Sequence, residues 1–233
     1  MVIPYREESP FATEIKRIAS TLKIANEESN IKAVMVTSSM LGEGKSTSAV
    51  YLAIAYSKLH ETKTLVIDLD LRRPSVHELF EVKKRWGVSD FLGGKKQVKA
   101  CIKKSEYDNL YIITSGSFSK YTPSELFNSA RLRDLFSELK LYFNMIIIDA
   151  PPLIPVSDPL LLGSEVDGAL FVIKTGKTQK PVIRRALQLL EDARIKTLGV
   201  ILNNMEHALP YYYEYHFYSY EYYSKPKTVS KKG

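Results

Sequence analysis

Residues 34–47 (VMVTSSMLGEGKST) constrain the fold more than any other stretch, because they predict a strand, a glycine-containing turn and a helix start in succession. Val34 and Val36 suit a buried strand. Gly42 and Gly44 allow a tight turn that brings backbone N–H groups close to an anion. The helix expected over residues 45–59 directs the positive end of its dipole to the same point. Because a chance turn would lack this context, we interpret the stretch as a phosphate-binding P-loop.

The side chains of this loop predict what it binds. Lys45 supplies a positive charge for the β- and γ-phosphates of a nucleotide, and the Ser46 hydroxyl is placed to ligate Mg²⁺. One departure from the usual pattern is Ser39, which stands where a first glycine is common. The residues expected to bind the nucleotide are Gly42, Glu43, Gly44, Lys45, Ser46 and Thr47.

Three aspartates stand where predicted strands end. Asp149 occupies the place of the Mg²⁺-associated aspartate of P-loop enzymes. Asp68 and Asp70 are two residues apart, so both can face the same side of an extended segment. One could help to hold Mg²⁺ and the other could accept a proton from an attacking hydroxyl. The structural alternative for either is a helix cap, or an ion pair with Arg72 or Arg73.

Strands and helices alternate along most of the chain. Further strands are expected at residues 109–114, 168–175 and 197–203, and helices at 123–141 and 181–193, with short helices over 75–104. This alternation predicts an α/β fold with a parallel, P-loop NTPase-like sheet and helices on both faces. Because ligands bind at the carboxyl ends of such strands, we expect the P-loop and the three aspartates to converge.

The two ends of the chain differ from this middle part. Residues 11–25 have the apolar stripe of an amphipathic helix, and residues 26–30 are a polar break. After residue 205 no period of 2 or 3.6 organises the sequence, which predicts a flexible tail. The expected organisation is therefore an N-terminal helical segment (1–30), a P-loop domain (31–205) and a tyrosine-rich tail (206–233).

The tail contains a cluster of tyrosines, and three interpretations remain open for it. It can be an aromatic binding strip, a low-complexity sequence without function, or a set of phosphate acceptors. A phenol hydroxyl extends far enough to reach a recessed γ-phosphate, and each phosphate would add roughly −1.5 to −2 charges. The candidate acceptors are Tyr211, Tyr212, Tyr213, Tyr215, Tyr218, Tyr220, Tyr222 and Tyr223.

Composition and charge narrow the classes of function that this chain can have. The net charge is +7, with many lysines and arginines at residues 83–104, which we interpret as a solvated basic face rather than a lipid or acidic-partner surface. No aromatic interleaving suggests a nucleic-acid partner. No run predicts a membrane span or a signal peptide, and the single Cys101 excludes an internal disulfide, so we expect a cytoplasmic protein.

Nearly the whole chain resembles the bacterial tyrosine kinases of the P-loop type (BY-kinases), which control capsule and exopolysaccharide synthesis. Residues 37–47 (TSSMLGEGKST) resemble their Walker A motif, residues 65–72 (LVIDLDLR) their Walker A′ motif and residues 146–152 (IIIDAPP) their Walker B motif. The tyrosine cluster is similar to the autophosphorylation site of this family.

The resemblance implies an ATP-dependent protein-tyrosine autokinase, in which Lys45 and Ser46 bind ATP and Mg²⁺. It implies that Asp68, Asp70 and Asp149 handle the metal and the incoming tyrosine, with Asp68 the better candidate for the base. It also implies phosphorylation of the tail by a neighbouring subunit in a ring. Glu14 and Arg17 match the Glu-x-x-Arg contact motif of that ring.

The ring motif often continues in this family with an arginine and an asparagine, where this chain has Ser20 and Leu22. Because the chain shows no membrane segment, it resembles the separate members of the family. Those members are activated, and recruited to the inner face of the membrane, by a membrane-bound adaptor of the polysaccharide co-polymerase type.

Two alternatives remain. The first is a MinD- or ParA-like ATPase, but such proteins carry a signature lysine where this chain has Met40, and they lack the tyrosine-packed tail. The second is a nucleotide-dependent scaffold whose tail binds partners without phosphate transfer.

Overall fold

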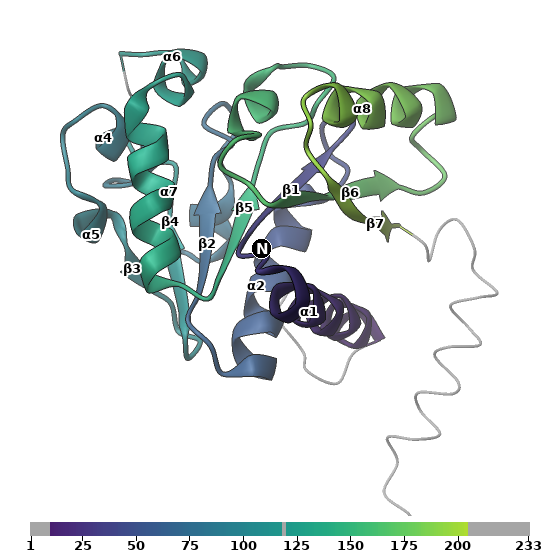
Figure 1. Cartoon of the computed structure of the whole chain (residues 1–233), viewed down its shortest axis with the longest axis horizontal. Helices are drawn as coiled ribbons and strands as arrows, with labels where there is room; N and C mark the ends of the chain where they lie inside the picture. The colour runs from purple at the N-terminus through teal and green to yellow at the C-terminus, as the bar shows by residue number, and fades with distance from the viewer. Residues whose placement is uncertain (1–9, 118–119, 205–233) are drawn as a thin grey trace, which may run out of the picture.

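The computed structural model describes residues 10–117 and 120–204, and their core is one sheet of seven strands in the order β3-β4-β2-β5-β1-β6-β7 (Figure 1). All neighbouring strands are parallel except β3 and β4. The predicted parallel α/β sheet is therefore confirmed, with one short antiparallel edge strand that the sequence pattern did not indicate. The predicted tail lies outside the described residues.

The elements follow the expected alternation along the chain. The strands are β1 (Ala33–Ser38), β2 (Thr64–Asp68), β3 (Lys103–Lys104), β4 (Leu110–Ile113), β5 (Met145–Asp149), β6 (Gly168–Lys174) and β7 (Thr197–Asn203). The helices are α1 (Pro10–Ser29), α2 (Lys45–His60), α3 (Val76–Leu79), α4 (Val88–Leu92), α5 (Val98–Cys101), α6 (Pro123–Phe127), α7 (Ala130–Tyr142) and α8 (Lys180–Asp192), with a 3₁₀ helix η1 (Asp158–Leu162).

Each central strand places alternate side chains in two different cores, one on either face of the sheet. In β2, Leu65 and Ile67 belong to the core that includes residues of α4, α7 and α8, whereas Val66 belongs to the core that includes residues of α1 and α2. The residues of β1, β2 and β5 are buried throughout, because helices cover both faces and leave no solvated side. The sheet is therefore a rigid platform for the loops at its carboxyl edge.

Helix α1 is longer than predicted, because residues 26–29 continue the helix instead of breaking it. The Asn26 amide donates to the carbonyl oxygen of Ile31 at 2.6 Å, so this polar residue ties the helix end to the start of β1. Asn30 then ends the helix in a left-handed conformation (φ 52°). The buried side of α1 packs against α2 through Ala19 and its neighbours. In the described part of the chain, no helix combines the length and apolar character needed to cross a membrane.

Candidate active site

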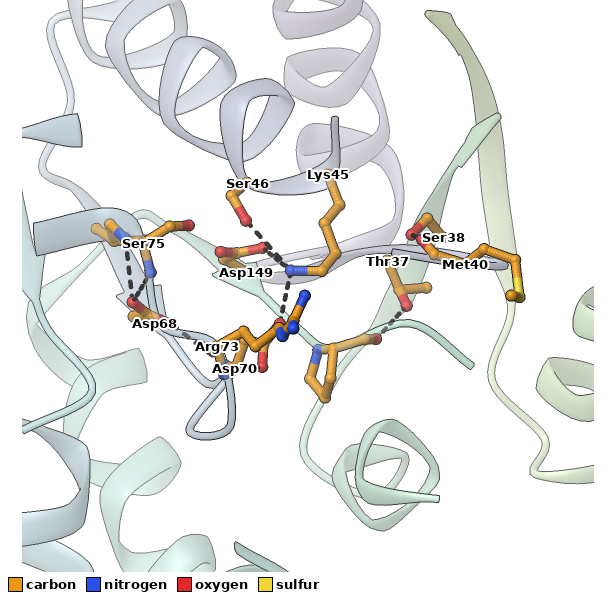
Figure 2. A network of polar contacts seen from close by, with 12 residues as sticks. Thr37, Ser38, Met40, Lys45, Ser46, Asp68, Asp70, Arg73, Ser75 and Asp149 are labelled. Carbon is orange, nitrogen blue, oxygen red and sulfur yellow. Dashed lines mark hydrogen bonds and ion pairs between the residues drawn. The ribbon is translucent and has the colours of Figure 1, made fainter. Parts of the chain in front are cut away.

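Sheet order brings the predicted site residues together. Strands β2, β5 and β1 are neighbours, Asp68 is in register with Asp149, and Asp149 is in register with Val36 just before the P-loop. The carboxyl ends of these strands meet at one edge, as expected for a ligand site in a parallel sheet. The edge therefore carries the P-loop and all three aspartates (Figure 2).

The P-loop depends on glycine at two positions. Gly42 and Gly44 have backbone φ angles of +75° and +95°, which residues other than glycine rarely adopt. A Cβ on Gly44 would lie 2.1 Å from the side-chain nitrogen of Asn203, which donates to the Glu43 carbonyl at 3.0 Å. Asn203 thus fastens the loop to the end of β7, a role that its position in the sequence did not reveal.

Lys45 lies at the centre of the site. Its ammonium nitrogen is 2.8 Å from Asp70 Oδ2, 3.5 Å from Asp149 Oδ1 and 3.2 Å from Ser46 Oγ (Figure 2). Burial alone would lower the Lys45 pKa, but the charges of Asp149 and Asp70 outweigh it and raise the pKa. Lys45 therefore remains charged and ready to meet phosphate oxygens.

Asp68 is fully buried and is held in place by backbone groups. One carboxylate oxygen accepts the N–H groups of Ser75 and Val76, both at 3.1 Å, and the other accepts that of Asp70 at 3.2 Å. Asp68 therefore caps α3, which was the structural alternative, while it also faces the site. Burial, followed by the charge of Asp149, raises its pKa. A carboxylate that accepts three hydrogen bonds still has a lone pair free to accept a proton.

Asp149 is a suitable metal-binding carboxylate. It is completely buried, and its Oδ2 has no hydrogen-bond partner among the described residues. Burial raises its pKa to about 6, although Lys45 and the Ser46 hydroxyl oppose that shift. The described residues contain no group of three or more His, Cys, Asp or Glu side chains able to hold a metal. This donor set fits Mg²⁺, which needs only one or two carboxylates when phosphates and water complete its shell.

Glu43 contributes to the loop differently from its neighbours. Its side chain is buried and accepts the Met40 N–H at 2.8 Å and the Thr178 hydroxyl. Because both carboxylate oxygens are used inside the protein, only the backbone N–H of Glu43 can serve a phosphate. Ser46 and Thr47 are half-buried at the first turn of α2.

Arg72 pairs with neither Asp68 nor Asp70. Its guanidinium instead makes a bidentate contact with Asp158, at 2.5 Å and 3.1 Å, and Ser124 Oγ donates to the same carboxylate at 2.9 Å. Asp158 is only 1% exposed, and it ties the segment after Asp70 to the starts of α6 and η1. Sequence reasoning missed Asp158 because no local motif links it to Arg72.

Replacing Asp158 by asparagine tests this anchor. We expect the free energy of unfolding of Asp158→Asn to fall by about 1–3 kcal/mol, because the buried charge-assisted bonds are lost. Denaturant unfolding would measure the change, with Asp192→Asn, an exposed aspartate on α8, as the matched control. Equal stability of the two variants would contradict the anchoring role.

Glu14 and Arg17 lie on α1, which packs against α2. They form an ion pair of 2.7 Å on α1 with 55% and 64% of their side chains exposed. The eight candidate tyrosines of the tail lie outside the described residues.

Comparison with known proteins identifies the family. An AAA domain family model matches residues 18–163. The tyrosine-protein kinase YwqD of Bacillus subtilis is 34% identical over 88% of this chain and 85% of its own length. The chain belongs to the bacterial tyrosine-protein kinases. The solved structure of the chimerical protein CapA2B2 is similar to this kinase with a TM-score of 0.81 and 31% identity, over 86% of this chain and 88% of that chain. The kinase domain of Escherichia coli tyrosine kinase ETK matches with a TM-score of 0.77 and 30% identity, and the match covers 81% of this chain and 73% of that chain.

These similarities confirm the predicted enzyme class, a protein-tyrosine kinase, and imply ATP use. The match to the tyrosine-protein kinase wzc of Salmonella typhi covers 91% of this chain but only 29% of that protein. The matched unit is therefore one part of a longer protein. The septum site-determining protein MinD from Pyrococcus horikoshii matches with a TM-score of 0.63 and 21% identity, over 73% of this chain and 69% of that chain. This similarity shows a shared fold and nothing more.

Proposed function

We propose that this kinase transfers the γ-phosphate of ATP to tyrosines of its own C-terminal segment, in trans, and thereby regulates capsule or exopolysaccharide synthesis. The observation that supports this most is the single buried cluster of Lys45, Asp68, Asp70 and Asp149 beside a P-loop. With Mg²⁺ bound, such a cluster can neutralise and position a transferring phosphoryl group, which is most of the catalysis in this reaction.

Each residue of the cluster has a proposed role. The P-loop N–H groups and Lys45 hold the β- and γ-phosphates, and Ser46, Asp70 and Asp149 would hold Mg²⁺. The ion, when bound, neutralises charge on the phosphate oxygens. Asp68 accepts the proton of the attacking phenol, a role supported by its burial and its raised pKa. On binding ATP, Lys45 would exchange part of its contact with Asp70 for phosphate oxygens.

Mapping of transferred phosphate tests the function. We expect labelled ATP and Mg²⁺ to modify only tyrosines between 211 and 223, and a chain ending at residue 210 to remain unlabelled. The reaction should be run with and without the cytoplasmic segment of a membrane adaptor. Release of free phosphate without labelled tyrosine would overturn the proposal in favour of an ATPase, and nucleotide binding with no turnover would favour a scaffold.

A ring of subunits would bring the segment of one subunit to the active site of the next. Glu14 and Arg17 are proposed ring contacts because both are exposed on α1, whose buried side packs on α2. An exposed ion pair contributes at most about 1 kcal/mol to stability, so its exposed groups are available to a neighbour at little cost to folding.

We expect the double variant Glu14→Ala/Arg17→Ala to lose the oligomer and most phosphorylation in trans. Light scattering across micromolar concentrations would measure the mass. Lys23→Ala/Glu27→Ala is the matched control, because these residues form another ion pair of the same helix, at 3.1 Å. An intact chain that is monomeric at every concentration would contradict the ring.

We further propose that residues 1–30, 31–205 and 206–233 serve as oligomer contact, kinase domain and acceptor segment. A membrane-bound adaptor of the polysaccharide co-polymerase type would activate the kinase and recruit it from the cytoplasm to the inner face of the membrane. In the relative wzc the matched unit is 29% of a longer chain, so a kinase unit of this family can be joined to a further protein part.

A further inference from the structure

A small cavity beside the active site has no part in the mechanism described above. Its volume is about 220 Å³, and it lies at the carboxyl end of β4, where Ser115 and Gly116 line it. Leu71, the residue after Asp70, forms another part of its wall. Because Leu71 directly follows Asp70, the cavity lies next to the carboxylates of the site. Its size suits a single side chain rather than a larger ligand.

The order of strands places this cavity on the acceptor side of the reaction. Along the sheet edge, the P-loop follows β1, Asp149 ends β5, Asp68 ends β2, and the cavity follows β4. Neighbouring strands are roughly 5 Å apart, so the cavity lies one strand beyond the proposed base. The attacking hydroxyl and the leaving ADP oxygen must be roughly in line across the phosphorus. Because the nucleotide is held over β1, the acceptor must approach from the side of β4.

The lining of the cavity suits a tyrosine side chain. Leu71, Leu126 and Tyr121 offer apolar and aromatic contact. Ser115 is only 2% exposed, and its hydroxyl has no hydrogen-bond partner among the described residues. A buried polar group of this kind carries a cost that a ligand hydroxyl can remove. Lys84, on the wall of the cavity, is exposed to solvent and favours a negatively charged neighbour of that side chain.

The spacing of the acceptor segment matches this geometry. Tyr218, Tyr220 and Tyr222 are two residues apart, so an extended chain presents them on one side, roughly 7 Å from one to the next. Tyr211, Tyr213 and Tyr215 repeat the spacing. Each set also contains a glutamate, Glu221 or Glu214. In an extended chain it faces the side opposite the tyrosines, so it adds negative charge to the segment near the exposed Lys84 without entering the cavity.

We propose that the cavity is a subsite for a second tyrosine of the acceptor segment, two residues from the tyrosine that is phosphorylated. The segment lies extended along the carboxyl edge, with one phenol at Asp68 and the next phenol in the cavity against Ser115. The identity of the occupant rests on the proposed function.

Peptide binding to the full chain without ATP tests the subsite. Three fluorescent peptides cover residues 216–224: the native sequence, one with Tyr218→Phe and Tyr222→Phe, and one with alanine at both positions. We expect the phenylalanine peptide to bind about threefold more weakly than the native one, because the contact with Ser115 is lost. The alanine peptide should bind at least about tenfold more weakly, because the ring contacts are lost as well.

Variants of the chain locate the effect. In Ser115→Ala the native and phenylalanine peptides should bind equally, and Tyr121→Ala should reduce the advantage of both over the alanine peptide. Lys84→Glu should weaken binding of the native peptide by about fivefold at low salt. Lys83→Glu is the matched control, because it is exposed and adjacent but does not line the cavity. Thermal melting of each variant would verify folding.

Equal affinity of the three peptides for the intact chain would overturn the subsite, whatever the phosphate-transfer result. The same conclusion would follow if Lys83→Glu and Lys84→Glu had the same effect on binding. If the expected order of affinities holds but ATP labels no tyrosine, the subsite stands and the proposed kinase reaction fails. The binding and transfer measurements therefore separate the two proposals.

Discussion

Lys45→Met is expected to reduce phosphate transfer to tyrosine by at least about a thousandfold. The Lys45 ammonium lies between two buried carboxylates and the P-loop, where no other side chain in the cluster supplies a positive charge to the phosphates. The rate of tyrosine labelling at saturating ATP would measure the loss. A residual rate above one-tenth of the intact enzyme would contradict the assigned role.

The same substitution should also destabilise the folded chain. Removing one partner of a buried ion pair leaves Asp70 and Asp149 without a compensating charge, which costs about 3–5 kcal/mol in comparable cases. Protonation of Asp149, whose pKa burial raises to about 6, would reduce this cost at low pH. Lys58→Met, an exposed lysine on the same helix, is the control and should change the free energy of unfolding by less than about 1 kcal/mol.

Asp149→Asn is expected to abolish transfer and yet stabilise the metal-free protein at neutral pH. Burial raises the pKa of Asp149 to about 6 from the ordinary 3.8, so the folded state binds its proton more tightly than the unfolded state does. The ionised carboxylate therefore destabilises the fold above pH 6, by up to about 3 kcal/mol, and this cost disappears as the pH falls toward 4.

Thermal unfolding with a chelator at pH 4.5 and pH 7.5 (roughly below and above the raised pKa) would measure this effect. The variant should be more stable than the intact chain at the higher pH, by up to about 3 kcal/mol, because the pKa of about 6 already includes the opposing contact with Lys45. The difference should shrink at the lower pH. A variant less stable than the intact chain at pH 7.5 would mean that attraction to Lys45 outweighs the cost of burial. Asp192→Asn, an exposed aspartate at the end of α8, is a control for nonspecific changes.

Most of the fold and much of the site followed from local patterns. The apolar runs at β1, β2 and β5 predicted buried parallel strands, because only strands covered on both faces are apolar throughout. The convergence of Asp68, Asp70 and Asp149 followed from their places at strand ends. The length of α1 was underestimated, because its last turn is polar and is held by the contact between Asn26 and Ile31 rather than by an apolar stripe.

The P-loop, the candidate carboxylates of the site and the alternation of strands and helices along the chain could be predicted from the sequence alone, because these depend on residue types at short spacing. The pairing of Arg72 with Asp158 rather than with a neighbouring aspartate, and the cavity that follows β4 beside Leu71, became apparent only in the three-dimensional structure. These contacts join residues far apart in the chain. Their partners are chosen by sheet order and by the packing of loops at one edge, which no local spacing encodes.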